Sequence, residues 1–291
     1  MIVDCHCHAG QGDRMTAPWN TDAPLAPYLR RARTAGIDKT IVFSAFHTNY
    51  AEANRRVARI VEQHPDRLIG FVMVHARRDA GRIRRMVKTA VDAWQFRGIK
   101  VHGLEASPTR ELCEAARMFA LPVLVDVGLK PEIIEMLAPQ YRDVNFIVPH
   151  LGSFIGDWKA HQQVIDQIVR HPNVFTDTSS VRHYDYIVQA IRRAGPRKVL
   201  FGSDGPYLHP GVEIHKIRLL GLSPENEALV LGGNILRLIG RDRAQLSTRK
   251  RRPRDRVVLT PDPMPIDQWE VNTWPSERSR ARGGRLRGGE R

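Results

Sequence analysis

The sequence predicts an α/β protein built as a barrel of eight parallel strands with helices outside, a (β/α)8 or TIM barrel. Three observations favour this fold. Eight short apolar runs alternate with amphipathic stretches, the 291 residues suit one such barrel, and polar residues gather where the apolar runs end. A doubly wound open sheet is the alternative, and it is disfavoured because no Gly-x-Gly-x-x-Gly turn follows the first run.

The predicted strands are short runs of nearly continuous apolar residues. This character is typical of parallel strands whose outer face is covered by helices. In order, the runs are 2–8, 39–45, 67–75, 98–103, 122–128, 145–152, 173–180 and 198–204.

Helices are predicted between the strands, where apolar residues recur every three or four positions. The clearest helical stretches are 50–64, 80–94, 109–120 and 183–195. Gly36, Pro65 and Gly195 stand where helices should end. A last helix at 223–240, capped by Ser223, would close the barrel.

The chain is expected to divide at residue 246. Residues 1–246 carry the barrel pattern, whereas 247–291 form a Pro-, Arg- and Gly-rich extension that we expect to be mostly disordered. The last 51 residues contain 14 Lys and Arg against 7 Asp and Glu, so half of the formal net charge of +14 lies there. Trp269 and Trp274 leave room for a short segment that docks on the barrel.

Composition limits the cellular compartments and the kinds of partner that we expect for this protein. No apolar run approaches the ~20 residues of a membrane span, and the first residues lack the basic and apolar regions of a signal peptide. Three cysteines are too few for a disulfide framework. We therefore expect a cytoplasmic homo-oligomer that acts on a small molecule and does not engage membranes. The basic extension is either a solvated tail or a nucleic-acid-binding segment.

The stretch IVDCHCHAG at residues 2–10 carries the first chemical signal. Residues two apart share one face of a strand, so His6 and His8 should point into the barrel together with Asp4. Cys5 and Cys7 should then face the helices. A single buried histidine is usually a core residue, but two on one interior face call for a shared cation or a polar pocket.

Other polar residues fall at the carboxyl ends of the predicted strands, where α/β barrels place their active sites. These residues are His75, Lys100, His102, Asp126, His150 and Asp204. Two histidines and an aspartate are good ligands for a divalent transition metal, and three protein ligands with one open position are usual in catalytic zinc sites. In the loops beyond, Arg182 and Tyr207 are candidate substrate-binding residues, and Arg182 with Lys100 would suit an anionic substrate.

These residues lie in motifs that resemble the amidohydrolase superfamily, in the amidohydrolase-related branch similar to aminocarboxymuconate semialdehyde decarboxylase. The likeness covers residues 1–240 and rests on segments that occur in the family's order. They read DCHCHAG, RRVARIVEQHPDRLIGFVMV, FRGIKVHG, LPVLVDVG, VNFIVPHLGSF, NVFTDTSS, VLFGSDGPY and LGGNILRLIG. The resemblance implies the barrel fold and metal-dependent chemistry.

By position, the resemblance makes His6 and His8 metal ligands from the first strand. Asp204 matches the aspartate that touches the metal and handles the proton of its water. His150 matches the histidine that orients or polarises water or substrate. Asp126 stands where the family usually has a metal-binding histidine, and it would either ligate the ion through oxygen or leave a weak or absent metal site. With an aspartate there, a mononuclear ion is favoured over a pair bridged by a carboxylated Lys100; zinc is expected, with manganese as the alternative.

The predicted function is a metal-dependent hydrolase that acts on a small, anionic amide, ester or lactone. Its catalytic residues would be Asp204 and His150, its metal ligands His6, His8, Asp126 and Asp204, and its substrate-binding residues Lys100, His102, Arg182 and Tyr207. Non-oxidative decarboxylation of a small carboxylic acid is the alternative, because the same ligands serve both reactions. A pseudoenzyme scaffold, or a protein that acts through a nucleic-acid-binding tail, is a further alternative.

Overall fold

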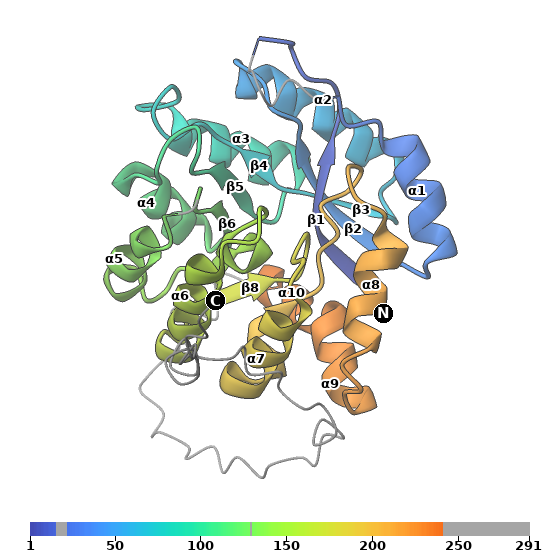
Figure 1. Ribbon diagram of the computed structural model, residues 1–291. Helices are drawn as coiled ribbons and strands as arrows, with labels where there is room; N and C mark the ends of the chain where they lie inside the picture. The colour runs from blue at the N-terminus through green and yellow to red at the C-terminus, as the bar shows by residue number, and fades with distance from the viewer. Residues whose placement is uncertain (16–21, 129, 241–291) are drawn as a thin grey trace, which may run out of the picture. The chain divides into compact units, whose positions relative to one another are not determined.

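A computed structural model describes residues 1–15, 22–128 and 130–240, and these residues form the predicted barrel (Figure 1). The predicted boundary at 246 and the whole extension 247–291, with its tryptophans, lie outside the described residues.

The strands follow one another in sequence order, and every pair that shares hydrogen bonds is parallel. They are β1 (Val3–Ala9), β2 (Lys39–Ser44), β3 (Leu68–Gly70), β4 (Val72–Met73), β5 (Ile99–His102), β6 (Val123–Asp126), β7 (Phe146–Val148), β8 (Val174–Asp177) and β9 (Val199–Leu200). The first three are paired in one sheet and the other six in a second. Because β3 and β4 are two parts of one predicted strand, interrupted at Phe71, the described strands occupy the eight predicted positions.

Backbone hydrogen bonds join the two sheets at both of their edges. The Phe71 N–H donates to the Val42 carbonyl at 2.9 Å, which links β2 to the start of β4. On the opposite side, the Cys5 N–H donates to the Phe201 carbonyl at 3.0 Å. A closed sheet has no unpaired edge, and its interior-facing side chains converge on one axis.

The helices cover the outer surface of the strands (Figure 1). They are α1 (Leu25–Thr34), α2 (Tyr50–Gln63), α3 (Ile83–Trp94), α4 (Arg110–Phe119), α5 (Glu132–Gln140), α6 (Trp158–Arg170), α7 (Tyr184–Ala194), α8 (Pro210–Arg218), α9 (Pro224–Ala228) and α10 (Asn234–Ile239), with the single turns η1 (Pro149–Gly152), η2 (Pro196–Lys198) and η3 (Leu229–Gly233). The helix predicted at 223–240 is therefore α9, the π-helical turn η3 and α10. Ser223 caps it as predicted, because its Oγ accepts from the Asn226 N–H at 3.4 Å.

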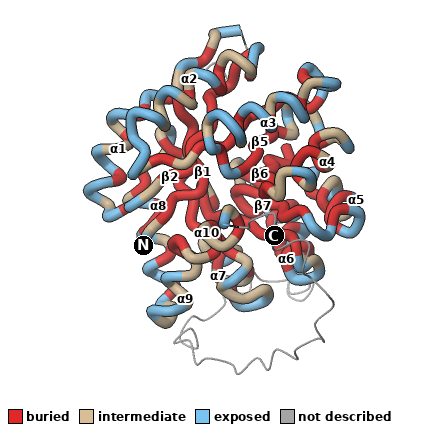
Figure 2. Tube along the Cα trace, turned by 180° about the vertical axis from the view of Figure 1, so that it is seen from behind, coloured by how far each residue is buried: buried red, intermediate tan, exposed pale blue. Residues whose placement is uncertain are grey.

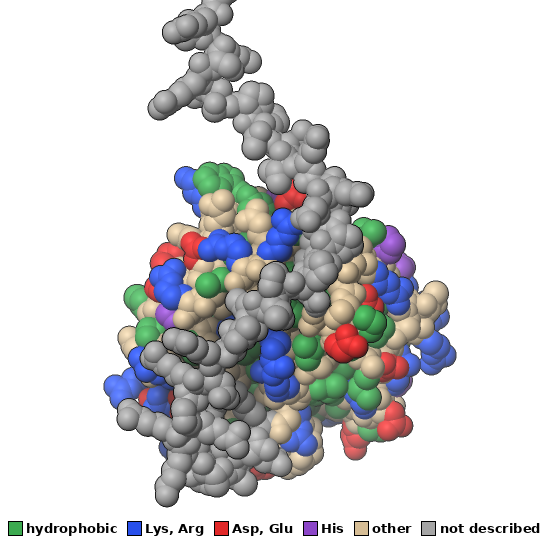
Figure 3. Space-filling model, turned by 90° about the horizontal axis from the view of Figure 1, so that it is seen from below, with side chains coloured by type: hydrophobic (Ala, Val, Ile, Leu, Met, Phe, Trp, Pro, Cys, Tyr) green, Lys and Arg blue, Asp and Glu red, His purple; other side chains and the backbone are tan. Residues whose placement is uncertain are grey.

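Buried residues concentrate on the strands, and exposed residues lie on the outer faces of the helices (Figure 2). The face in Figure 3 carries basic and acidic side chains interspersed rather than gathered by sign. Mixed charge of this kind is typical of a solvated surface. Among the helices that the structure describes, none is long and apolar enough to cross a membrane.

The first strand departs from the predicted alternation, and the expected placements of Asp4 and Cys5 were wrong. The register of β1 against β2 shifts between Asp4 and Cys7. Asp4 turns toward α1, where it accepts a hydrogen bond from Tyr28 Oη at 2.5 Å. Cys5 instead joins the buried core with Leu124 of β6. An irregularity of this kind places neighbouring residues on one side of a strand, so the simple period of two fails here.

Candidate functional site

A cavity of about 190 Å³ lies at the carboxyl ends of the strands. Its lining residues are His6, His8, Phe46, Lys100, His102, Asp126, His150, Phe154, Asp204 and Tyr207. They come from β1, β5 and β6 and from the turns that follow β2, β7 and β9. Barrel closure therefore brings residues that are almost 200 positions apart in the sequence into one small space.

His6 and His8 direct the same ring atom toward Asp204. Their Nε2 atoms lie 3.5 Å and 3.7 Å from Asp204 Oδ1. The Nδ1 atom of His6 lies 2.9 Å from Asp177 Oδ2, and that of His8 lies 3.2 Å from the Ser44 carbonyl oxygen. Carboxylate and carbonyl oxygens only accept, so both Nδ1 atoms carry the proton and both Nε2 atoms present a lone pair.

Burial keeps both imidazoles neutral. It lowers the pKa of His6 and lowers that of His8 well below the ordinary value, and the positive charge of Lys100 acts in the same direction on both. Neutral imidazole is the form that binds a metal ion.

Asp204 is held beside the imidazoles by the strand that precedes it. The neighbouring Ser203 N–H donates to Asp4 Oδ1 at 2.9 Å, and Ser203 Oγ donates to the other oxygen of the same carboxylate. Burial raises the pKa of Asp4 to about 6, although the hydrogen bonds from Ser203 and Tyr28 oppose the rise. Asp4, which points away from the predicted site face, thus ties β1 to the segment that follows the carboxyl end of β9.

His150 lies across the cavity and is anchored through its backbone and its ring. It has a left-handed backbone, with φ 58°. Its N–H donates to Asp177 Oδ1 at 3.1 Å, and its Nδ1 lies 2.8 Å from the Ser179 carbonyl oxygen. The ring centroids of His150 and His6 are 4.9 Å apart. With the proton on Nδ1, the Nε2 lone pair of His150 faces the cavity side occupied by Asp126, 3.9 Å from its Oδ2.

Asp177 is the central residue that sequence reasoning missed. It accepts from His6 Nδ1, from the His150 N–H and from both Oγ and N–H of Ser179, at 2.5–3.1 Å. Burial raises its pKa, but the attraction of His6 and these hydrogen bonds outweigh burial and hold the pKa far below the ordinary value. One signal was available, because Asp177 is an acidic residue in the second half of the seventh predicted strand, 173–180, and follows its apolar residues as the candidate residues do in the other strands.

Asp126 faces the cavity, but it lies beside His102 rather than in the group of His6, His8 and Asp204. His102 Nε2 is 3.0 Å from Asp126 Oδ2. Burial alone would raise the pKa of Asp126, yet the attraction of His102 and the hydrogen bond to it hold that pKa well below the ordinary value. The structure therefore places the aspartate in a second polar cluster of the same cavity.

Lys100 is completely buried between the two clusters. Its Nζ lies 3.5 Å from His6 Nε2 and 4.8 Å from the centre of the Phe43 ring. Burial lowers the pKa of this ammonium, and the carboxylates of Asp126, Asp204 and Asp177 counteract the decrease. The amine thus contacts the same ring atom that faces Asp204.

Of the two substrate-binding residues predicted in the loops, one lines the cavity and the other does not. Tyr207 lines the cavity, with its ring centroid 5.3 Å from that of His8. Arg182 is exposed and is not among the residues that line the cavity. His75, at the end of the third predicted strand, instead accepts hydrogen bonds from the backbone of the following turn. Phe46 and Phe154 also line the cavity, and no sequence pattern singled them out, since apolar residues after a strand are common.

The donor atoms fit a divalent metal ion. His6, His8 and Asp204 each offer one ligand atom, and these atoms lie within 4.8 Å of one another. Two neutral nitrogen donors and one carboxylate oxygen form a set that zinc accepts, with a position left open. The ligand atoms of a second group, His6, His150 and Asp177, also lie within 4.8 Å of one another. Their proximity is explained by the hydrogen bonds that Asp177 accepts from the other two residues. Asp126 belongs to neither group.

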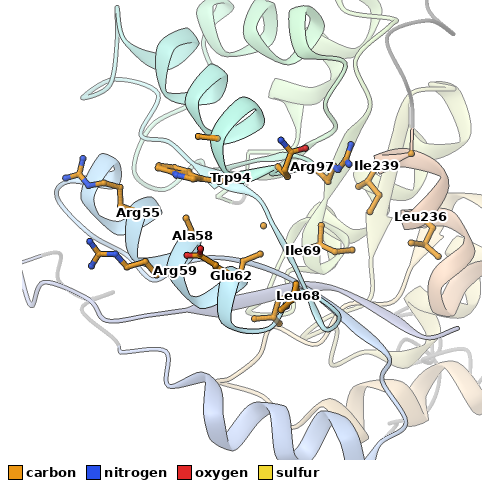
Figure 4. A pocket seen from close by; sticks show the side chains of 16 residues that line it. Arg55, Ala58, Arg59, Glu62, Leu68, Ile69, Trp94, Arg97, Leu236 and Ile239 are labelled. Carbon is orange, nitrogen blue, oxygen red and sulfur yellow. The ribbon is translucent and has the colours of Figure 1, made fainter.

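A larger groove of about 900 Å³ lies elsewhere on the barrel (Figure 4). It is lined by residues of α2, β3 and α10 and by the end of α3, and Leu68, the first residue of β3, is among them. The carboxyl-terminal parts of α2 and α3, at Glu62 and Trp94, also line it, and these helix ends lead into the amino-terminal ends of the next strands, whereas barrel enzymes react at the carboxyl ends. Among the described residues that line this groove, Glu62 is the one carboxylate and there is no histidine.

Comparison with known proteins agrees with the geometry. The amidohydrolase family model matches residues 3–241. No curated protein matches the sequence at a significant level.

Several solved structures share the fold at low identity. The 5-carboxyvanillate decarboxylase of Sphingomonas paucimobilis is 14% identical with a TM-score of 0.60, and the match covers 83% of this chain and 99% of that one. The 4-oxalomesaconate hydratase of Rhodopseudomonas palustris is 18% identical with a TM-score of 0.64, over 85% and 98% of the two chains. A protein of Acinetobacter baumannii assigned as a 2-pyrone-4,6-dicarboxylic acid hydrolase is 15% identical with a TM-score of 0.63, over 82% and 99%. The family model spans the whole described barrel, and the chain belongs to the amidohydrolase family.

Proposed function

We propose that the protein is a metal-dependent hydrolase that acts on a small, anionic amide, ester or lactone. One observation carries the proposal. The lone pairs of His6 and His8 and the Oδ1 atom of Asp204 converge inside a buried cavity of about 190 Å³. The size of this cavity supports a small-molecule substrate.

His6, His8 and Asp204 would hold the ion, and Asp126 would not. A divalent metal ion bound there lowers the pKa of water toward ~7 and polarises a carbonyl group. Asp177 and the Ser44 carbonyl keep the two imidazoles in the tautomer that such binding requires.

Asp204 and His150 are the groups that handle the attacking water. Asp204 would accept a proton from the water through the carboxylate oxygen that does not face the two imidazoles, and would later deliver it to the leaving group. His150 carries its proton on Nδ1, so its Nε2 accepts a hydrogen bond from the same water and orients it. Because Ser179 and Asp177 fix His150 on two sides, little orientation is lost when substrate binds.

The substrate we propose is small, flat and negatively charged. Phe46, Phe154 and Tyr207 supply aromatic walls to the cavity, and Lys100 supplies a positive charge. The named compounds of the structural neighbours, carboxyvanillate, a pyrone dicarboxylic acid and oxalomesaconate, are small carboxylic acids. Likeness at this level supports the class of substrate and not its identity.

Non-oxidative decarboxylation is the second candidate. It is favoured by the His102–Asp126 pair, which lies in the cavity apart from the metal-binding group and beside Phe46. An acid at that position would protonate the carbon that loses carboxylate. The structural neighbours include decarboxylases of 5-carboxyvanillate and of 2,6-dihydroxybenzoate.

One experiment separates the two reactions and tests the metal. The purified protein is analysed for metals and then incubated with small lactones, esters, amides and aromatic acids in H₂¹⁸O, with and without a chelator. Hydrolysis incorporates ¹⁸O into the product, whereas decarboxylation releases CO₂. We expect chelator-sensitive ¹⁸O incorporation that is lost in His6→Ala and kept in His161→Ala, a buried histidine that does not line the cavity. Activity that is unaffected by the chelator would overturn the metal mechanism.

A further inference from the structure

We propose that the positively charged amine of Lys100 belongs to the metal site and opposes metal binding. Lys100 thereby sets the affinity of the site for an ion. This inference rests on the proposed function, because it concerns the ion held by His6, His8 and Asp204.

The position of Lys100 is the first reason. Its Nζ lies 3.5 Å from His6 Nε2, which is the ring atom that also lies 3.5 Å from Asp204 Oδ1. His6 Nδ1 is engaged by Asp177, so Nε2 holds the one lone pair of this ring available to any cation. Lys100 and a metal ion therefore compete for the same electron pair.

Charge is the second reason. Among the described residues that line the cavity, Lys100 is the one lysine or arginine, and it faces the carboxylates of Asp126 and Asp204. It is fully buried, so water does not screen its charge as it would at the surface. An ammonium beside the ligands repels an incoming divalent ion. It also reduces the favourable electrostatic energy between that ion and the carboxylates.

The packing of Lys100 is the third reason, because it leaves the amine little freedom to withdraw. The side chain starts from the middle of β5, and its Nζ lies over the Phe43 ring, which also contacts His6 and His8. The same aromatic ring thus fixes the ammonium and both imidazoles relative to one another.

Zinc affinity tests this role without measuring activity. Metal-free wild type and Lys100→Met are titrated with zinc in competition with a chromophoric chelator. We expect Lys100→Met to bind zinc about tenfold or more tightly than wild type, and Lys100→Arg, which keeps the charge, to bind no more tightly than wild type.

Lys198 provides a matched control. Its Nζ lies 4.6 Å from the centre of the Phe175 ring, as that of Lys100 lies over Phe43, but it donates to the carbonyls of His171 and Val174 and does not line the cavity. Lys198→Met should leave zinc affinity unchanged. Circular dichroism establishes that each variant is folded, and Lys100→Gln replaces Lys100→Met if the methionine variant does not fold.

The outcomes distinguish this inference from the proposed function. If wild type binds zinc and the neutral variants bind it equally or more weakly, Lys100 is not a competitor, and a tenfold loss would make it a ligand. If only the neutral variants bind zinc, the competition is supported and the metal mechanism of the wild type fails. If none of them binds zinc, both proposals are overturned.

Discussion

At the scale of single residues, Asp177 links the two halves of the candidate site. Its carboxylate fixes the ring of His6 and the backbone of His150 at once. Outer partners of this kind commonly change metal affinity by ~10–100-fold when they are removed. We expect Asp177→Asn to weaken zinc binding by about that factor. The amide oxygen is needed to accept from Ser179 and the His150 N–H, so the NH₂ is left toward His6 Nδ1–H, which it cannot accept. Chelator competition measures the change.

Asp166→Asn is the control for this variant. Asp166 forms an ion pair with Arg193 on the outside of the barrel, with both side chains about half exposed. Its loss should not alter zinc binding. Equal affinities in Asp177→Asn and wild type would show that Asp177 does not orient His6.

His8 predicts how the metal-free protein responds to acid. Burial holds its pKa well below the ordinary value, whereas in the unfolded chain it titrates near ~6.5. As the pH falls below about 6.5, the unfolded state takes up a proton that the folded state does not, so this residue makes the free energy of unfolding decrease. Urea denaturation at several pH values should show a smaller decrease for His8→Gln than for wild type. The exposed His64→Gln should behave as wild type does, and an unchanged slope in His8→Gln would contradict the prediction.

The two N-terminal histidines were predictable because a local pattern, His-x-His at the start of an apolar run, needs only the strand itself. Asp177 was harder to find because its role depends on His6, which is 171 residues away. The same holds for Asp4, since Tyr28 and Ser203 draw it from the predicted face. Long-range partners override local periodicity.

At the scale of elements, two phenylalanine–glycine pairs pack around the break between β3 and β4. The Phe71 ring packs over Gly98, before β5, and the Phe96 ring packs over Gly70. A Cβ atom on Gly98 would lie 2.3 Å from Phe71 Cζ, and the ring is fully buried. The rings thus occupy the space that side chains at these two positions would need.

We expect Gly98→Ala to reduce the free energy of unfolding by about 1–3 kcal/mol, the usual cost of overpacking a core. Chemical denaturation measures it. In the double variant Phe71→Leu with Gly98→Ala, the alanine should cost less than it does alone, because the smaller side chain makes room. If the two changes are simply additive, the ring is not what excludes a side chain at Gly98.

Strands were the most predictable elements. All eight apolar runs became strand positions, because parallel strands covered by helices leave a clear apolar signature. The break at Phe71 could not be predicted, since β3 pairs with β2 and β4 pairs with β5, and an apolar run does not indicate with which neighbour each of its residues pairs.

At the scale of the whole molecule, the described residues that line the cavity run from His6 to Tyr207. A chain that ends at residue 246 should therefore bind zinc as tightly as the full chain does, within about twofold, and show the same chelator-sensitive activity. Calorimetry and chelator competition measure both proteins side by side. A marked loss of affinity would show that residues 247–291 contribute to the site. The prediction that these residues bind nucleic acid is separate and needs its own binding assay.

The closure of the ring has a consequence for how the protein is made. His8 receives its last backbone partner only from Gly205, whose carbonyl lies 2.6 Å from the His8 N–H, and Asp204 precedes that glycine. During synthesis on the ribosome, His6 and His8 emerge first, and almost the entire barrel is translated before Asp204 can approach them. A nascent chain halted anywhere before Asp204 has only part of the donor set, so we expect stable metal uptake to be a late event in biogenesis.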